Sequence, residues 1–371
     1  HDQGGHMSVM LTMDLMGEDL FPRARGYGWY VGDYNYTAST NFQSARVEYV
    51  WGLYFDLVNN ANKIIKNVPN AVGTPAEKDH LIGQAFAMRG FSYFMNAQIY
   101  CKPYLHTDID ALDSGLPIYL EPTEIGTYRE TIRNTYQQII NDLDSAYTRL
   151  TRSGIGASNI SYINTSVVRG LQARVALVMG DYVNAETYAN EARQGYPLMT
   201  EEQYIGREMF EEDTKGGAFT VANNEWMWGS YVNDEQSTIF ASWLSHMDPT
   251  TYGYAQLGNM KLIARALYDA IPATDYRKKC YNDAAGVNPM DPSGYWDWYP
   301  YMVYKFRRST GGWEQSYPYM RASEMYLIEA EAIARQGGRD GEAAQVLLDL
   351  LNPTPADGDK DDAYVLSTNT G

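Results

Sequence analysis

The sequence predicts a mostly α-helical protein, in which a tetratricopeptide-like helical-repeat scaffold carries an irregular, aromatic-rich lobe containing short strands. Three observations support this prediction. Apolar residues recur at helical spacing in several regions, glycines mark the ends of those regions, and the remaining stretches are rich in Gly, Asn, Tyr and Trp. We expect one domain over residues 1–371, with helical pairs at about 46–103, 130–194 and 319–352 and the lobe at about 1–45 and 195–318.

The first helical regions carry continuous apolar stripes. Between residues 50 and 68, apolar side chains recur at every third or fourth position and therefore share one helix face. Residues 79–100 repeat this pattern and end before Pro103, and residues 130–150 repeat it again. Either Asn164 or Thr165 is suited to cap the next helix, because a short polar side chain can accept a hydrogen bond from a free backbone N–H group.

Two helix corners indicate an internal repeat. Residues 173–192 combine a helix, a Gly-Asp-Tyr corner and a row of alanines, and a shift of 157 positions superimposes Gly337 on Gly180. Glycine at a corner accepts positive φ, and small residues let a neighbouring helix approach closely. This pattern is typical of a tetratricopeptide-like unit, which buries its apolar face by stacking on the next unit.

Composition narrows the function classes. The chain has 29 Lys+Arg and 46 Asp+Glu, a net charge of −17, which argues against nucleic acid as a partner. No run of about 18 apolar residues predicts a membrane span. Cys101 and Cys280 favour two free thiols, with a single bridge as the alternative. Both chain ends look truncated, so we expect any export signal or anchor to lie outside this sequence.

Catalytic and metal-binding motifs are weak. The scattered histidines form no metal-ligand pair, and no nucleotide-binding or nucleophile motif is found, so the protein is not expected to be an enzyme. A glycoside hydrolase stays an alternative, because two carboxylates can converge in space. No cofactor is expected either. Calcium is the alternative, since acidic residues alternate as in a calcium loop at Asp108, Asp110 and Asp113, and again at Asp357, Asp359, Asp361 and Asp362.

The aromatic residues carry the functional prediction. The chain has 32 Tyr, 8 Trp and 10 Phe, and two Gly- or Pro-flanked clusters combine them with amides and carboxylates. A sugar ring offers an apolar face for stacking and a rim of hydroxyl groups for hydrogen bonds, and rigid aromatic side chains lose little entropy on binding. The candidate ligand-binding residues are therefore Trp29, Tyr34, Asn35, Tyr36, Trp296 and Trp298.

The competing interpretation is that these rings pack the lobe against the helices. Trp226 and Trp228 alternate on an expected strand within residues 225–232, so we expect them to share a buried face. A second strand-like run covers residues 218–221, and residues 261–271 are expected to form a helix.

Several segments resemble one family. The run GQAFAMRGFSYFMNAQIYCKPYL (83–105) resembles the signature helix of the SusD/RagB family. Residues 128–150 resemble its next helix, residues 165–192 its Ala-rich helix and Gly-Asp-Tyr corner, and MRASEMYLIEAEA (320–332) a late helix; Asp275 and Arg277 match a short DxR element. Two departures are Cys101-Lys102 in place of Gly-Asp, and the Pro353-Thr354-Pro355 run in place of the usual ending after Asn352.

The resemblance implies a surface glycan-binding protein of a starch-utilisation-type nutrient-uptake system. SusD-like proteins are lipid-anchored on the extracellular face of Bacteroidota outer membranes, where they capture oligosaccharides or polysaccharides for import through a TonB-dependent, SusC-like transporter. They are not enzymes and need no cofactor, although some bind calcium. The alternatives are a peptide-binding member of the family and a helical-repeat scaffold for protein docking. Given the charge of −17, a neutral glycan is expected rather than an acidic one.

Overall fold

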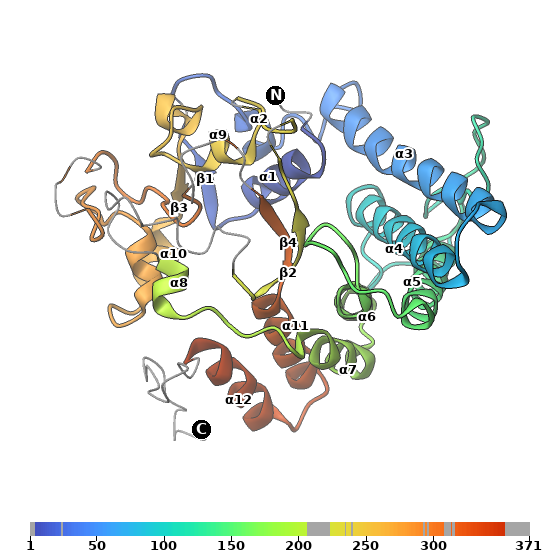
Figure 1. Ribbon diagram of the computed structural model, residues 1–371. Helices are drawn as coiled ribbons and strands as arrows, with labels where there is room; N and C mark the ends of the chain where they lie inside the picture. Colours follow the sequence, from blue (N-terminus) through green and yellow to red (C-terminus); the bar gives the residue numbers. More distant parts are fainter. Residues whose placement is uncertain are drawn as a thin grey trace.

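The computed structural model describes residues 4–23, 25–205, 223–233, 235–238, 240–291, 294, 297–307, 313 and 316–352. Within these residues, a row of helices lies beside a lobe that contains short strands, and the N-terminus belongs to the lobe (Figure 1). The predicted fold class is therefore confirmed.

The scaffold draws its helices from three parts of the chain. Neighbouring helices pack in order, α3 on α4, α4 on α5, α6 on α7, α7 on α11 and α11 on α12. Their bounds are α3 (Ala45–Asn67), α4 (Pro75–Tyr100), α5 (Ile132–Ser153), α6 (Thr165–Met179), α7 (Tyr182–Arg193), α11 (Ala322–Arg335) and α12 (Asp340–Leu351). A short 3-10 turn, η1 (Val68–Asn70), follows α3.

Local sequence explains where these helices begin and end. The Thr74 side chain accepts a hydrogen bond from the backbone of Glu77 and the Glu77 carboxylate accepts one from Thr74 in return, a capping box at the start of α4. Asn164, rather than Thr165, caps α6. The two corner glycines that the repeat predicts both adopt the left-handed conformation, with φ of 75° at Gly180 and 76° at Gly337.

Close packing between α4 and α5 depends on a small residue. A Cβ atom added at Gly83 would lie 2.8 Å from Cγ of Leu150, so only glycine permits this approach. At the same interface, Arg89 is buried and forms a bidentate ion pair with Asp142, with N–O distances of 2.6 and 2.9 Å. The remaining Nη1 of Arg89 donates to Oδ1 of Asn62 at 2.7 Å, which joins α3 to the same cluster.

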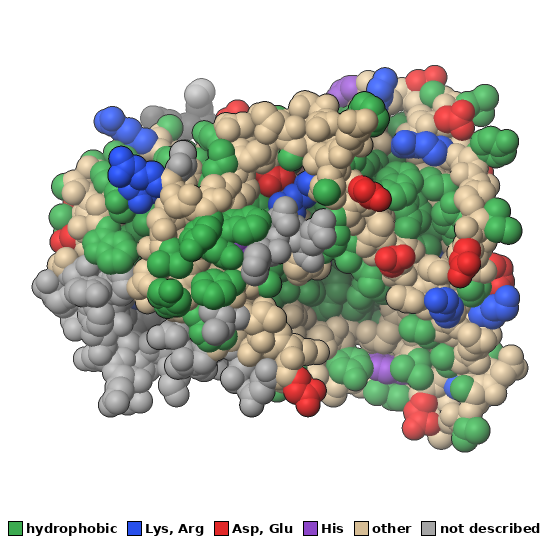
Figure 2. All heavy atoms as spheres, turned by 90° about the horizontal axis from the view of Figure 1, so that it is seen from above, with side chains coloured by type: hydrophobic (Ala, Val, Ile, Leu, Met, Phe, Trp, Pro, Cys, Tyr) green, Lys and Arg blue, Asp and Glu red, His purple; other side chains and the backbone are tan. Residues whose placement is uncertain are grey.

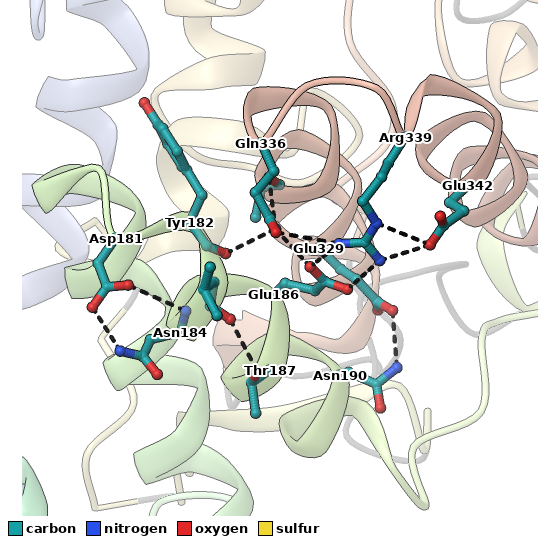
Figure 3. A network of polar contacts seen from close by, with 12 residues as sticks. Asp181, Tyr182, Asn184, Glu186, Thr187, Asn190, Glu329, Gln336, Arg339 and Glu342 are labelled. Carbon is teal, nitrogen blue, oxygen red and sulfur yellow. Dashed lines mark hydrogen bonds and ion pairs between the residues drawn. The ribbon is translucent and has the colours of Figure 1, made fainter.

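A second polar network joins α7 to the last helix pair (Figure 3). Arg339 donates to both carboxylate oxygens of Glu186, at 2.7 and 2.9 Å, and also to Glu342 at 2.6 Å. Gln336 donates to Glu186 at 2.6 Å, and Asn190 donates to Glu329 at 2.8 Å. The stacking of α11 on α7 therefore combines apolar burial with charge-assisted hydrogen bonds.

The lobe is built from short elements and two small antiparallel sheets. In one sheet Phe21 lies opposite Leu262, and in the other Trp226 lies opposite Arg321, directly before α11. The elements are α1 (His6–Met16), β1 (Leu20–Pro22), α2 (Val31–Tyr34), α8 (Glu201–Ile205), β2 (Trp226–Ser230), α9 (Trp243–Met247), η2 (Ala255–Asn259), β3 (Lys261–Ile263), α10 (Arg265–Ala270), η3 (Tyr276–Cys280) and β4 (Tyr317–Arg321). Figure 1 shows β2 and β4 at the centre, between lobe and scaffold.

Helix α1 was not predicted, because the sequence reading assigned residues 1–45 to irregular structure. Its apolar residues occupy several sides of the helix and form no single stripe. In the fold, Val9 packs into the scaffold's hydrophobic cluster, whereas Met7, Leu11 and Leu15 pack into that of the lobe. A helix that is buried on several sides lacks the amphipathic pattern that sequence analysis detects.

Two other local predictions were wrong in detail. Residues 261–263 of the expected helix form strand β3, because they pair with β1; helix α10 begins only at Arg265. Trp226 and Trp228 are both buried, but Trp226 belongs to the lobe's cluster and Trp228 to the scaffold's. The register of β2 against β4 shifts between them, so the alternation rule fails there. The strand expected at 218–221 lies outside the described residues.

Candidate functional site

An open cavity of about 500 Å³ lies in the lobe, where residues following β1 meet two later segments of the chain. Its wall combines two aromatic rings with an arginine, a carboxylate and an amide. The lining residues are Arg23, Gln256, Leu257, Gly258, Met260, Asp297, Trp298 and Tyr299.

Backbone contacts hold the three segments together. The N–H of Arg23 donates to the carbonyl of Met260 at 2.9 Å, and Nδ2 of Asn259 donates to the carbonyl of Arg23 at 3.2 Å. Gly26 has a φ of 79°, and a Cβ atom there would lie 3.0 Å from the carbonyl oxygen of Leu257. Glycine is therefore required for the close approach of this loop.

The third segment, residues 297–299, is held in place by the side-chain amide of Asn282. Nδ2 of Asn282 donates to the carbonyl of Tyr299 at 3.0 Å, and an isolated bridge pairs Leu262 with Met302. The guanidinium carbon of Arg23 lies 3.7 Å from the centre of the Tyr299 ring. This cation–π contact joins the first segment directly to the third.

The cavity presents the groups that a sugar requires. Trp298 is 38% exposed and lies beside Asp297, whose Oδ1 accepts a hydrogen bond from the N–H of Asn288 at 2.8 Å. Indole and phenol faces can stack on the C–H face of a pyranose, while Asp297 and Gln256 can bond to its hydroxyl groups. Figure 2 shows hydrophobic side chains exposed on the left half of the face seen from above, the side on which the lobe lies in Figure 1, and further groups of them on the right half.

A buried lysine follows the cavity-lining Met260 in the sequence. Nζ of Lys261 donates to the carbonyl oxygen of Asn259 at 2.9 Å and to its Oδ1 at 3.2 Å. Burial lowers the pKa of Lys261 to about 7, because the charged form is poorly solvated there. Since Asn259 also bonds to Arg23, this lysine positions the backbone on which the cavity is built.

The candidate ligand-binding residues predicted from the sequence do not all lie at the cavity. Trp298 lines the cavity, whereas Trp29, Tyr34, Asn35 and Tyr36 are not among its lining residues. Tyr34 and Tyr36 are exposed, at 41% and 48%, beside Asn35 at the end of α2. The ring of Trp29 is partly buried and packs 5.3 Å from that of Tyr254 and 6.2 Å from that of His246, measured between ring centres. Trp296 lies outside the described residues.

Sequence reasoning missed Arg23 and Gln256 as cavity residues and left two exposed tyrosines, Tyr27 and Tyr252, unassigned. Tyr27 packs edge-on against Tyr254, 4.9 Å between ring centres. The sequence does mark these two tyrosines as loop residues, since each lies next to glycine: Tyr27 stands between Gly26 and Gly28, and Gly253 separates Tyr252 from Tyr254. Arg23 gave no such signal, because only the fold brings it to Tyr299.

One residue of the acidic run at 108–113 forms an ion pair. Asp110 pairs with Arg133 at 2.6 and 2.8 Å, and hydrogen bonds from this guanidinium lower the pKa of Asp110. No group of three or more potential metal-ligating side chains occurs in the described ranges. The second acidic run, Asp357 to Asp362, lies outside them. Cys101 and Cys280 are both free thiols, the first half-buried and the second buried.

None of the helices in the described part of the chain is both long enough and apolar enough to cross a membrane. Residues 10–176 match a SusD-like family described as starch-binding and associating with the outer membrane, and residues 181–352 match the SusD family, SusD/RagB. A comparison with curated proteins gave no match.

Several solved structures share the fold. A SusD-like carbohydrate binding protein from Bacteroides vulgatus is 26% identical, with a TM-score of 0.76 over 99% of this chain and 73% of that one. A SusD superfamily protein from Bacteroides thetaiotaomicron is 20% identical, with a TM-score of 0.72 over 94% and 75%. Surface glycan-binding protein A from Bacteroides uniformis is 15% identical, with a TM-score of 0.64 over 92% and 75%.

Proposed function

Since the chain belongs to the SusD/RagB family, we propose that it binds oligosaccharides or polysaccharides in the cavity around Trp298 and delivers them to a partner transporter. The partner is a TonB-dependent, SusC-like protein of the outer membrane, and the binding protein works on the extracellular face, held by a lipid anchor. Binding is non-catalytic and needs no cofactor.

One observation carries the proposal: an exposed indole, a carboxylate and an amide meet in one open cavity. Trp298 supplies the stacking face, and Asp297 and Gln256 supply hydrogen-bond partners for hydroxyl groups. Rigid aromatic side chains bind with a small entropic cost, which suits shallow sites. The names of three solved relatives support this chemistry, a SusD-like carbohydrate binding protein, a laminarin binding SusD-like protein and a surface glycan-binding protein.

Affinity electrophoresis through gels containing single polysaccharides tests the proposal. We expect at least one polysaccharide to retard the protein, and Trp298→Ala to weaken that retardation about ten-fold, as expected for the loss of about 1.4 kcal/mol of stacking. Tyr128→Ala is the matched control, since Tyr128 is 89% exposed on the distant segment before α5. No retardation across a broad panel would reject glycan binding and favour peptide capture.

Catalysis, metal dependence and partnership are tested separately. Incubation with the retarding polysaccharide should release no reducing ends, and EDTA should leave retardation unchanged. Co-expression with the SusC-like protein of the source organism should yield a complex in outer-membrane extracts. Failure to recover a complex would remove the transporter from the proposal while leaving glycan binding intact.

A further inference from the structure

Arg23 brings a positive charge to the cavity wall without a carboxylate partner in the described part of the chain. Its side chain finds one acceptor among these residues, the sulfur of Met260, 3.9 Å from Nη1. A thioether is a weak acceptor, so the other guanidinium N–H groups remain available to a ligand. By contrast, Arg89, Arg174 and Arg193 of the scaffold each pair with a carboxylate.

The contact with Tyr299 prepares this guanidinium for binding. At 3.7 Å from the ring centre, the group is in van der Waals contact with the ring, which limits its motion. The backbone on both sides of the contact is also fixed, by Met260 and Asn259 at Arg23 and by Asn282 at Tyr299. A pre-positioned guanidinium loses less freedom when it forms two parallel hydrogen bonds to a carboxylate.

Resting on the proposed function, we infer that this cavity selects glycans that carry carboxylate groups, as uronic acids do. Arg23 binds the carboxylate, Trp298 stacks on the sugar ring, and Asp297 accepts hydrogen bonds from hydroxyl groups away from Arg23. This inference reverses the expectation of a neutral glycan that the net charge of −17 suggested.

Screening explains why the local charge outweighs the net charge. At physiological ionic strength, exposed charges more than about 8 Å apart are largely screened. The acidic residues of the scaffold helices, which lie beside the lobe in Figure 1, are therefore expected to act weakly on a ligand in the cavity. A guanidinium in direct contact with the ligand is screened much less.

Carboxyl reduction provides the matched ligands for a test. Polygalacturonate, alginate and hyaluronan are each compared with the same polymer after its carboxylates have been reduced to alcohols, and neutral polysaccharides are run beside them. We expect at least one acidic polymer to bind, with affinity at least ten-fold higher than its reduced form, and this advantage to shrink as salt is raised.

Three variants test the residue. Arg23→Gln should lose the ten-fold advantage of the acidic polymer, and Arg23→Lys should keep part of it, because it retains the charge without the two-pronged geometry. Lys63→Gln, an exposed site on α3, removes the same charge far from the cavity and should change nothing. Circular dichroism and melting curves of all variants show whether each one is folded.

The outcomes separate the two proposals. Binding of neutral polysaccharides alone, or equal binding of acidic and reduced polymers, overturns the inference and leaves glycan binding in place. An acidic preference that survives in folded Arg23→Gln also overturns it. Binding of no polymer, acidic or neutral, rejects the proposed function, and the inference falls with it.

Discussion

In the scaffold, buried charges come in pairs from neighbouring helices, whereas in the lobe Lys261 is buried against neutral oxygen atoms. Arg89 and Asp142 neutralise each other between α4 and α5, and Asn62 completes the hydrogen bonds of the pair. Lys261 instead bonds to the carbonyl and amide oxygens of Asn259. The scaffold is thus organised for stability, and the lobe accepts an unfavourable burial beside its candidate ligand cavity.

Breaking the scaffold's buried pair should have the largest effect. Arg89→Met leaves Asp142 buried without its partner, and we expect the free energy of unfolding to fall by about 3–5 kcal/mol. Urea denaturation measures this change. Arg133→Met is the control on α5, the helix that carries Asp142, because the Arg133–Asp110 pair is more than half exposed and should contribute less than about 1 kcal/mol. Equal losses in both variants would contradict the comparison.

The lysine of the lobe should make stability depend on pH. In the unfolded chain Lys261 keeps its proton up to about pH 10.5, whereas in the fold its pKa is about 7. Between these values the unfolded state binds more protons, so stability rises with pH by up to about 1.4 kcal/mol per unit. Urea denaturation from pH 7 to 10 should show a shallower slope for Lys261→Met. An identical slope would mean that Lys261 is charged in the fold.

The two corner glycines of the repeat allow a smaller, matched test. A Cβ atom at Gly180 would lie 3.0 Å from Cδ2 of Leu105, whereas one at Gly337 would meet no atom within 4 Å. Alanine at either position adopts the left-handed conformation at a cost of about 1–2 kcal/mol. Gly180→Ala should lower the melting temperature more than Gly337→Ala. A larger fall in melting temperature for Gly337→Ala would show that Leu105 moves away from the added methyl group at no cost in stability.

The smallest effect is expected at the end of α2. Tyr34 and Tyr36 are exposed but do not line the cavity, so Tyr34→Ala and Tyr36→Ala should each weaken polysaccharide retardation less than three-fold. Each variant loses one local contact, with Phe21 or with the carbonyl of Met16, so the melting temperature should fall only slightly. A loss as large as that of Trp298→Ala would extend the binding surface from the cavity to this loop.

The scaffold was predictable because the features that form its helices act between residues close together in the sequence. Apolar stripes, Asn164 and the corner glycines each act within a few residues of chain, so the sequence reading could place α3 to α7, α11 and α12 closely. Helix α1 and strand β3 escaped it, since their conformations depend on burial and pairing with distant segments. The cavity was half predictable: Trp298 lay in an evident aromatic cluster, whereas Arg23 becomes a cavity residue only through its contact with Tyr299.

The contact between Arg23 and Tyr299 joins a residue near the start of the chain to one far along it, so a bound glycan would hold these distant segments of the lobe together. A ligand that binds only the folded state adds about 2.7 kcal/mol to the free energy of unfolding at a hundred-fold excess over its Kd. The protein would then be most resistant to heat and to proteases when nutrient is plentiful. A rise in melting temperature on adding a polysaccharide would identify the nutrient without any label.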